Sequence, residues 1–328
     1  MSKTIKKIGV LTSGGDSPGM NAAIRSVVRT CAFHDIECLG IYRGYQGMIE
    51  GDFKEMNARS VNNIINKGGT ILKSARSKEF MTPEGRKKAY DNLVKAGVDS
   101  LVVIGGDGSF TGAEVFNSEY GFPVMGIPGT IDNDIFGTSH TLGYDTALNT
   151  VVDVIDKIRD TASSHNRLFL VEVMGRDAGH IALNAGIGAG AEEILIPEED
   201  LGLDRLLDSL KKSKASGKSS SIVVIAEGDK IGKNVFELKD YIEEHLPEYD
   251  VRVSVLGHMQ RGGSPSCFDR VLASRLGVKA VDSILEGKSN YMVGIIQDKI
   301  ALTPLEQAIK GSSEIDQELV RVSDIMST

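Results

Sequence analysis

The chain has 328 residues, which is enough for about two domains of roughly 150 residues each. Its 37 Lys and Arg against 45 Asp and Glu leave a net charge of −8, which argues against binding to nucleic acid or to an anionic membrane surface. No apolar run reaches the length of about 18 residues that a spanning helix needs, and the three cysteines have neither disulfide nor zinc-site spacing, so we expect a cytoplasmic protein.

Short runs rich in Val, Ile and Leu recur along the chain. They are continuously apolar more often than alternating, which is typical of parallel strands that are covered on both faces. The predicted strands are Lys7–Thr12, Glu37–Tyr42, Ser100–Ile104, Pro123–Ile127, Leu168–Met174, Ile194–Pro197, Ser221–Ala226, Val251–Leu256 and Met292–Ile296.

Amphipathic segments lie between these strands. Thr82 and Pro83 predict the start of a helix that ends before Gly97, and the apolar stripe from Gly143 to His165 predicts a long one. Alternating strands and helices indicate right-handed βαβ units and an α/β fold. No Pro- or Ser-rich linker divides the chain, so the chain is expected to cross between its two domains several times.

Two predicted strands lead into glycine-rich turns, Ser13–Asp16 and Gly105–Ser109. A strand that enters such a turn and then a helix directs backbone N–H groups and the positive end of the helix dipole toward a phosphate. Asp107 adds a carboxylate that suits Mg²⁺. One turn alone is equally well a tight connection with Asp107 as N-cap, but two favour phosphate binding. Neither turn matches a P-loop or the dinucleotide fingerprint of the Rossmann fold.

An acidic loop, Pro128–Asp134 (PGTIDND), follows another predicted strand. If the loop is extended, Thr130, Asp132 and Asp134 point to one side. One carboxylate can then take a proton from an attacking hydroxyl, while the other orients a group or helps to hold a metal. An Asx-turn loop is the alternative, because Asp and Asn are ordinary turn residues. The glycine turn upstream favours the catalytic interpretation.

Several polar residues stand next to predicted strands or glycine turns. An acidic protein that binds phosphates must concentrate cations locally, and the planar guanidinium of Arg suits phosphate. Glycine turns, a magnesium carboxylate, a candidate base and arginines together indicate phosphoryl transfer. The residues concerned are Arg76, Arg167, Arg176, Arg252 and Arg261, with Glu227 and His258 as candidate sugar contacts.

The motifs LTSGGDSPGMNAAIR, GGDGS, PGTIDND, GYDTALNT, VEVMGR and LGHMQRGGSP occur in this order, and the whole chain resembles bacterial ATP-dependent 6-phosphofructokinases. The resemblance implies two Rossmann-like three-layer α/β/α domains with mostly parallel sheets and a cleft between them. Residues 1–143 plus 260–310 would bind ATP, and residues 144–259 plus 311–328 fructose 6-phosphate. The implied reaction phosphorylates the sugar 1-hydroxyl to give fructose 1,6-bisphosphate and ADP, the committed step of glycolysis, in a homotetramer.

The resemblance also implies residue roles. Asp132 would be the base, with Thr130, Asp134, Arg76 and Arg176 completing the catalytic group, and Asp107 would hold Mg²⁺. The nucleotide site would comprise Gly15, Tyr45, Arg76, Ser77, Gly106, Asp107, Gly108 and Ser109. The sugar phosphate would contact Thr130, Ile131, Asp132, Met174, Gly175, Arg176, Glu227, His258, Met259, Gln260 and Arg261. Arg167 and Arg252 would reach into the site of a neighbouring subunit.

The phosphoryl donor depends on two glycines. Relatives that use pyrophosphate typically carry an Asp in the GGDG turn and a Lys before the Thr of TIDND, whereas this chain has Gly108 and Gly129. ATP is therefore the expected donor, and a pyrophosphate-dependent enzyme is the alternative. Ser77 and Met81 replace an aromatic and a basic residue of some members, which leaves the choice between ATP and GTP open.

An effector site for ADP or phosphoenolpyruvate is implied by Arg25, Arg29, Arg159, Gly190, Glu192 and Lys218. Ala58, Ser216 and Ser219 stand where members of the family carry Arg or Lys, so effector binding is expected to be weakened or altered. A nucleotide or lipid kinase sharing only GGDG would leave the other motifs unexplained. A binding-only regulatory protein on this fold would need a disabled base, and Asp132 is present.

Overall fold

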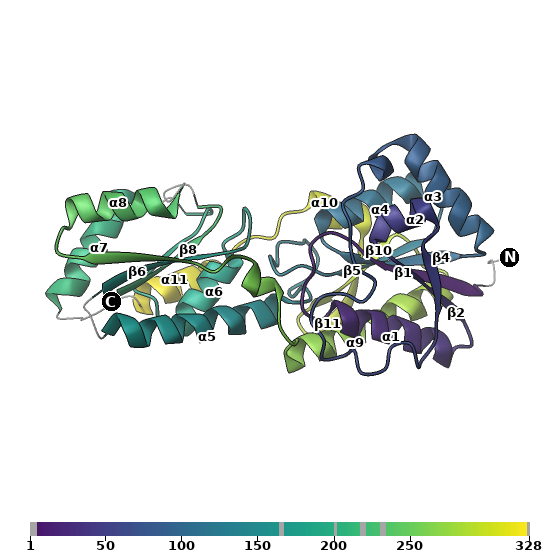
Figure 1. The fold of residues 1–328 in the computed structure, drawn as a ribbon, viewed down its shortest axis with the longest axis horizontal. Coiled ribbons are helices and arrows are strands. Elements are labelled where there is room, and N and C mark those ends of the chain that lie inside the picture. The colour runs from purple at the N-terminus through teal and green to yellow at the C-terminus, as the bar shows by residue number, and fades with distance from the viewer. Residues whose placement is uncertain (1–4, 164–166, 200–201, 217–220, 230–233, 327–328) are drawn as a thin grey trace. The chain divides into compact units, whose positions relative to one another are not determined.

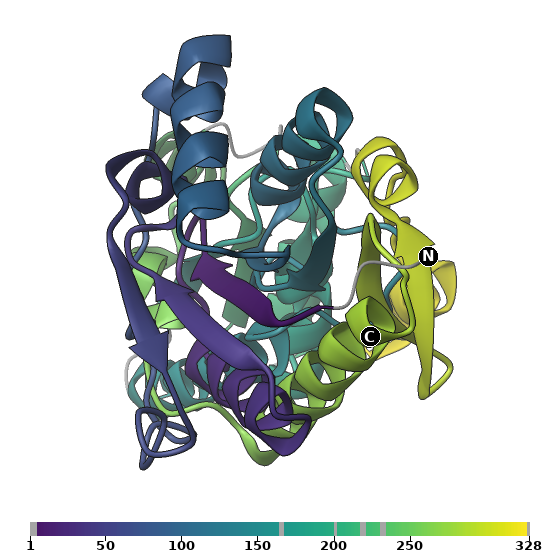
Figure 2. The ribbon, with the colours of Figure 1, turned by 90° about the vertical axis from the view of Figure 1, so that its right-hand side faces the viewer.

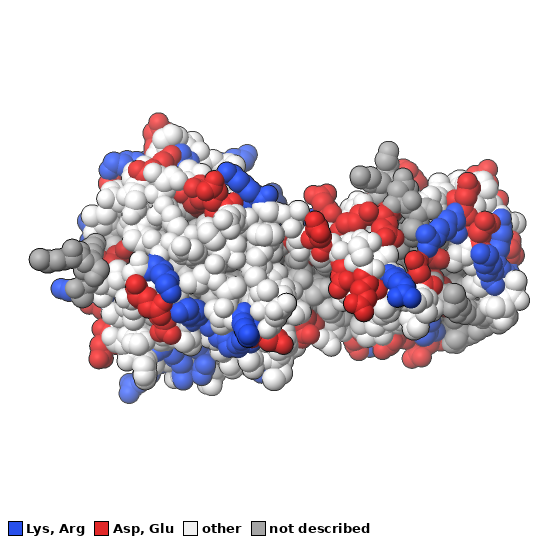
Figure 3. All heavy atoms as spheres, turned by 180° about the vertical axis from the view of Figure 1, so that it is seen from behind, with Lys and Arg blue, Asp and Glu red and all other residues white. Residues whose placement is uncertain are grey.

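Figure 1 shows the computed structural model, which describes residues 5–163, 167–199, 202–216, 221–229 and 234–326. The chain forms two compact units. Unit 1 comprises Met1–Ile131, Ile135–Thr146 and Arg261–Ser313, and unit 2 comprises Asp132–Asp134, Ala147–Gln260 and Glu314–Thr328. Among the described helices, none is long and apolar enough to cross a membrane. Acidic and basic side chains are interspersed on the face shown in Figure 3.

Unit 1 contains a seven-stranded sheet in the order β11-β10-β5-β4-β1-β2-β3. The central strands are parallel, whereas the edge strands β3 and β11 are antiparallel to their neighbours. The strands are β1 (Lys7–Thr12), β2 (Glu37–Ile41), β3 (Phe53–Met56), β4 (Ser100–Gly105), β5 (Val124–Pro128), β10 (Tyr291–Ile296) and β11 (Lys299–Pro304).

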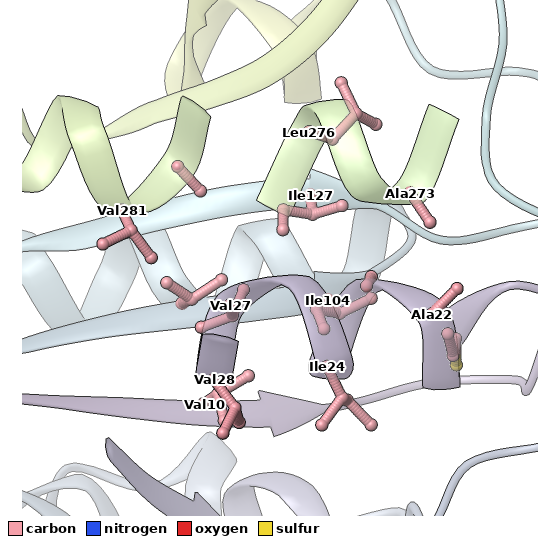
Figure 4. Close-up of a cluster of buried hydrophobic side chains, with 14 of the residues drawn as sticks. Val10, Ala22, Ile24, Val27, Val28, Ile104, Ile127, Ala273, Leu276 and Val281 are labelled. Atoms are coloured by element: carbon pink, nitrogen blue, oxygen red, sulfur yellow. The ribbon is translucent and has the colours of Figure 1, made fainter. Parts of the chain in front are cut away.

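Helices cover both faces of this sheet. On one face α1 (Met20–Phe33) and α9 (Cys267–Leu285) lie side by side, as Figures 1 and 2 show. Val10, Ile104 and Ile127 point from the strands toward these two helices (Figure 4). The other face is covered by α2 (Gly44–Glu50), the 3₁₀ helix η1 (Glu79–Met81), α3 (Pro83–Lys95), α4 (Asp107–Tyr120) and α10 (Leu305–Lys310). Because alternate residues of each strand enter opposite cores, the strands are continuously apolar.

Unit 2 contains a parallel four-stranded sheet in the order β7-β8-β6-β9. Its strands are β6 (Arg167–Val173), β7 (Glu193–Leu195), β8 (Ser221–Ala226) and β9 (Asp250–Val255). One face packs on α7 (Leu203–Ala215) and α8 (Val235–His245), and the other carries α5 (Tyr144–Ser163), α6 (His180–Ala189) and α11 (Gln317–Met326). The 3₁₀ helix η2 (Gly257–Arg261) follows β9.

The predicted α/β class with mostly parallel sheets is confirmed. Every predicted strand is present within two residues of its expected bounds, and Thr82 caps α3 by accepting a hydrogen bond from the Gly85 N–H at 3.1 Å. Ala147, Val151 and Ile155 of α5 are fully buried, as the apolar stripe predicted. The sequence did not predict β3 and β11, because edge strands are covered less completely and their residues are mixed polar and apolar.

Candidate active site

The two glycine turns lie side by side in unit 1, because they leave the neighbouring parallel strands β1 and β4 at the same edge of the sheet. The Ser13 N–H donates to the Ile104 carbonyl at 3.0 Å. A Cβ at Gly105 would lie 2.5 Å from the Ser13 carbonyl oxygen and 2.5 Å from the Ser109 Oγ. Only glycine fits at position 105, so the sequence allows the two turns to form one continuous backbone surface.

The second turn presents the start of α4. Gly106 is the N-cap residue, and Asp107 is the first helical residue rather than the cap. Asp107 and Gly108 are exposed, and a Cβ at Gly108 would meet no heavy atom within 4 Å. The first N–H groups of a helix have no intrahelical partner and attract anions. The arrangement therefore suits a phosphate, and the Asp107 carboxylate beside it suits the Mg²⁺ that accompanies phosphates.

The start of the acidic loop packs against this turn. The Gly129 N–H donates to the Gly105 carbonyl at 2.9 Å, and a Cβ at Gly106 would lie 3.7 Å from the Thr130 Cβ. Thr130 thus stands beside the predicted phosphate site. Because consecutive Cα atoms are about 3.8 Å apart, the Asp132 Cα follows within about 7.6 Å of that of Thr130.

A second group of candidate site residues lies in unit 2. Asp132 is 1% exposed, and its Oδ2 lies 3.4 Å from the Nε of Arg176, whose side chain is 60% exposed. The Arg176 backbone is left-handed, with φ 54°, and its N–H donates to the Glu227 Oε1 at 2.8 Å. Arg176 and Glu227 follow the neighbouring parallel strands β6 and β8, and Arg176 contacts both Asp132 and Glu227. Burial, and then the Glu227 charge, raise the pKa of Glu172 in β6.

Gln260, which is predicted to contact the sugar phosphate, holds two parts of unit 2 together. Its side chain is fully buried, accepts a hydrogen bond from the Met174 N–H at 3.2 Å and donates to the Gly257 carbonyl at 3.0 Å. Gln260 therefore fixes η2 to the end of β6. His258 and Met259 on the same turn are exposed, as a ligand contact requires.

Arg261 lies at the first glycine turn. Its Nη1 donates to the Asp16 carbonyl at 3.3 Å, and a Cβ at Gly15 would lie 2.8 Å from that nitrogen. Gly15 thus lets the guanidinium approach the backbone closely. Arg76 is exposed, in a segment whose Lys73 carbonyl accepts a hydrogen bond from Thr12 Oγ1 at 2.9 Å. Arg261 therefore lies at the carboxyl edge of the unit 1 sheet, and the segment before Arg76 contacts the end of β1 there.

Tyr45, which is predicted to line the nucleotide site, is packed in the core of unit 1. It is 7% exposed, stacks on Phe80 with ring centroids 4.1 Å apart, and donates to the Ser109 carbonyl at 2.5 Å. Burial raises its pKa above the ordinary value for a phenol. Tyr45 therefore supports the first turn of α4 through its hydrogen bond to Ser109. Ser77 donates to the Gln46 Oε1 at 2.7 Å, and Met81 is 79% exposed.

Arg167 and Arg252 share one carboxylate. The Arg167 Nε and the Arg252 Nη2 each lie 2.9 Å from an oxygen of Asp250, and the hydrogen bond from Arg167 is the main reason that the Asp250 pKa is lowered. Both arginines lie at the amino end of the parallel strands β6 and β9. The 7 residues of β6 rise by about 3.3 Å each, so Arg167 lies about 20 Å from the carboxyl end of the strand, beyond which Arg176 follows.

The predicted effector residues fall in both units. Arg25 and Arg29 lie one turn apart on α1, and burial, then the Arg29 charge, lower the Arg25 pKa. In unit 2 the Arg159 Nη2 donates to the carbonyls of Ala189 and Gly190 at 2.7 Å each, and its Nη1 lies 3.8 Å from Glu192. Ala58 and Ser216 are exposed, whereas Lys218 and Ser219 lie outside the described residues.

Two buried polar residues next to the site were not predicted. The Thr141 Oγ1 donates to the Thr130 carbonyl at 2.6 Å, and Asp269 of α9 accepts hydrogen bonds from Gly143 and Thr146. Ser266 is followed three residues later by Asp269, which matches the capping-box pattern at the start of a helix. This pattern is the sequence signal that could have drawn attention to Asp269. Nothing in the sequence tells which other segment that carboxylate contacts.

Adjacent glycine turns at a helix start, an exposed carboxylate, and a buried carboxylate paired with arginine are the parts of an α/β phosphoryl transferase. Within this class, residues 7–284 match the family model described as Phosphofructokinase, and the chain belongs to that family. The prediction from the sequence motifs is therefore confirmed.

Similar proteins cover nearly the whole chain. The chain is 54% identical over 319 residues to ATP-dependent 6-phosphofructokinase 2 of Bacteroides thetaiotaomicron, which covers 97% of this chain and 98% of that protein. It is 53% identical over 323 residues to ATP-dependent 6-phosphofructokinase of Shouchella clausii, covering 98% and 100%. The solved phosphofructokinase of Saccharomyces cerevisiae superposes with a TM-score of 0.89 and 37% identity over 98% of this chain, which spans 46% of the yeast chain.

Proposed function

We propose that this protein is an ATP-dependent 6-phosphofructokinase, which phosphorylates the 1-hydroxyl of fructose 6-phosphate. Relatives that are 53–54% identical over nearly their full length carry that name. The observation that carries the proposal is the packing of Thr130 of the acidic loop against the glycine turn at Gly105 and Gly106. This packing supports a phosphate-binding surface next to the base.

The backbone of unit 1 binds the donor in this proposal. The phosphates of ATP lie at the start of α4, where the N–H groups and the dipole attract them. Asp107 holds Mg²⁺, which neutralises charge on the phosphates when it is bound. Arg76 is exposed and is available to the phosphates in this proposal. The hydrogen bond from the Tyr45 hydroxyl to the Ser109 carbonyl fixes the first turn of α4.

Asp132 acts as the base. It accepts the proton of the sugar 1-hydroxyl while the hydroxyl oxygen forms a bond to the terminal phosphorus of ATP. The bond from that phosphorus to the bridging oxygen breaks, and its electron pair leaves with ADP. Arg176 stabilises the charge on the transferred phosphoryl group, since its guanidinium is 60% exposed and lies next to Asp132. Glu227 orients Arg176 through the backbone N–H.

The choice of ATP over pyrophosphate depends on the space at the two glycines. Gly108 leaves open space at the start of α4. Gly129 is buried, and a Cβ there would lie 3.1 Å from the Met20 Cε and 3.2 Å from the Ile104 Cγ2. A lysine at 129 would therefore need repacking of the core. The absence of both side chains favours the larger donor.

The remaining parts of the proposal concern the oligomeric state, the effectors and the cellular compartment. We propose a homotetramer in which Arg167 and Arg252 serve the sugar-phosphate site of a neighbouring subunit, supported by their distance from Arg176 along β6. ADP or phosphoenolpyruvate would act at the effector residues. The three cysteines are free, which favours a reducing compartment such as the cytoplasm.

A coupled assay with fructose 6-phosphate, Mg²⁺ and either ATP or pyrophosphate tests the proposal. We expect turnover with ATP only. Asp132→Asn is expected to lower kcat by about 10²–10⁴ with little change in the KM for the sugar. Asp153→Asn, which changes an exposed carboxylate of α5 paired with Lys157, is the matched control and should leave kcat unchanged. Equal activity of the Asp132 variant and the control would refute the base, and turnover with pyrophosphate alone would refute the donor.

A further inference from the structure

Asp269 is a fully buried carboxylate in the first turn of α9. Its Oδ1 accepts a hydrogen bond from the Gly143 N–H at 2.9 Å. Its Oδ2 accepts one from the Thr146 N–H at 2.9 Å and one from the Thr146 Oγ1 at 2.5 Å. Burying a carboxylate is costly unless such donors compensate it. Asp269 therefore binds the segment that leads into α5, which is remote from it in sequence.

The segment that Asp269 binds also packs on the chain just after the first glycine turn. Gly143 has φ +100°, and a Cβ there would lie 2.7 Å from the Ser17 Cβ and 2.9 Å from the Pro18 Cδ. The Asp269 Cβ itself would lie 3.6 Å from a Cβ at Gly19, the residue before α1. Asp269 thus fixes the segment from Thr141 to Thr146 against the exit of the first glycine turn.

The same segment holds the start of the acidic loop. Leu142 forms an isolated β-bridge with Gly129, and its N–H donates to the Pro128 carbonyl at 2.9 Å. The buried Thr141 hydroxyl donates to the Thr130 carbonyl at 2.6 Å. A continuous set of hydrogen bonds therefore runs from the Asp269 carboxylate to the backbone of Thr130. No member of this set is placed to touch a ligand in the proposed mechanism except Thr130.

We propose that Asp269 and Thr141 are positioning residues for phosphoryl transfer: they hold the backbone of the acidic loop at Thr130, and thereby the base at Asp132, in register with the glycine turns. The inference rests on the proposed function. Placement errors of about 1 Å in a catalytic group cost about 10²-fold in rate. The loop needs such support because Gly129 on one side of Thr130 has no side chain with which to anchor it.

Burial raises the pKa of Asp269, and the bonds from Thr146 and Gly143 act in the opposite direction. Asp145, which accepts a hydrogen bond from Ser266, is the other charged group facing it. The three hydrogen bonds that the Asp269 carboxylate accepts from Gly143 and Thr146 fix its geometry.

A matched pair of variants at Thr141 tests the inference. Thr141→Val removes the hydroxyl and keeps the branched shape, whereas Thr141→Ser keeps the hydroxyl. We expect Thr141→Val to lower kcat by about tenfold or more while the KM for ATP changes less than about twofold, and Thr141→Ser to restore most of kcat. Equal kcat values of the parent and the Val variant, or an equal loss in both variants, would overturn the inference.

Asp269→Asn supplies the second measurement, because one oxygen of the carboxylate becomes an NH₂ that faces an N–H donor. Asp282→Asn on the same helix is the control, since Asp282 is partly exposed and pairs with His34 at the surface. We expect a lower kcat for the Asp269 variant only. If the Asp269 variant folds and has the kcat of the parent, the positioning role of Asp269 is contradicted. If the variant does not fold, the Thr141→Val and Thr141→Ser variants decide between the outcomes.

Hydrogen exchange separates this inference from the proposed function. In Thr141→Val we expect faster exchange of the amides between Gly129 and Asp134, with unchanged exchange in α3. If the parent fails to phosphorylate fructose 6-phosphate but this exchange increases, the activity is refuted and the positioning role stands. If the parent is active and neither kcat nor exchange changes in the variant, the positioning role is refuted alone.

Discussion

A methyl group at position 108 tests whether phosphates bind at the start of α4. Gly108 is the second residue of that helix, it is exposed, and a Cβ there would meet no protein atom within 4 Å. Gly108→Ala therefore causes no steric conflict in the protein itself. Because alanine restricts the unfolded chain and favours a helix, the variant should be more stable by about 0.4–1 kcal/mol.

The same methyl group should weaken ATP binding. It projects into the space that the phosphates occupy and displaces them from the N–H groups of the turn. Loss of one hydrogen bond to a charged group costs about 1.5–3 kcal/mol, which corresponds to an increase in the KM for ATP of about 10- to 150-fold. In Gly108→Asp a negative charge about 4 Å from a phosphate adds an electrostatic repulsion of about 4 kcal/mol at an effective dielectric constant of 20. ATP binding would then be weakened by close to a further thousandfold.

The assay compares the KM for ATP with the unfolding free energy from urea titrations. Ser118→Ala, at the exposed far end of α4, is the control for the change in helix propensity and should leave the KM unchanged. The expected signature is a more stable Gly108→Ala protein with a higher KM. A Gly108→Ala protein with the parental KM for ATP would refute phosphate binding at this helix start. Turnover with pyrophosphate in Gly108→Asp would identify residue 108 as a determinant of the donor.

Two further substitutions test contacts outside the phosphate site. Asp250→Asn removes the carboxylate shared by Arg167 and Arg252. These arginines lower the pKa of Asp250 in the folded protein. The ionised carboxylate therefore stabilises the fold above the unfolded-state pKa of about 3.9, and this contribution is lost as the pH falls through the lower pKa of the folded state. Unfolding free energies of parent and variant should therefore differ at pH 6 and converge in acid, and a constant difference would contradict the pairing. Tyr45→Phe leaves the Ser109 carbonyl without the phenol donor, so we expect a loss of about 1–3 kcal/mol in thermal unfolding, and parental stability would be the contrary result.

The central strands could be predicted because burial on both faces makes them continuously apolar. The edge strands β3 and β11 escaped prediction, since each is covered less completely and its short sequence mixes polar and apolar residues without a regular pattern. Site residues that directly follow a strand, such as Asp107 and Glu227, could also be predicted, because parallel strands bring their carboxyl ends to one edge.

Side-chain burial in the site could not be predicted, because it depends on contacts between segments that are remote in sequence. Tyr45 enters the core through Phe80 and the Ser109 carbonyl. Gln260 is buried against Met174 in the same way. In both cases the resemblance to the family predicts a site residue and leaves open whether the residue binds a ligand or supports a residue that does. Only the tertiary contacts distinguish these two roles.

The two groups of arginines in unit 2 bear on how the sites are completed. Arg176 follows the carboxyl end of β6, whereas Arg167 begins β6, about 20 Å from that end, and Arg252 lies opposite Phe169 near the start of β9. The two groups therefore lie toward opposite ends of the parallel strands. In the proposed assembly the amino-end group would serve the sugar-phosphate site of another chain. Asp250 pairs with both amino-end arginines and so keeps Arg167 and Arg252 together.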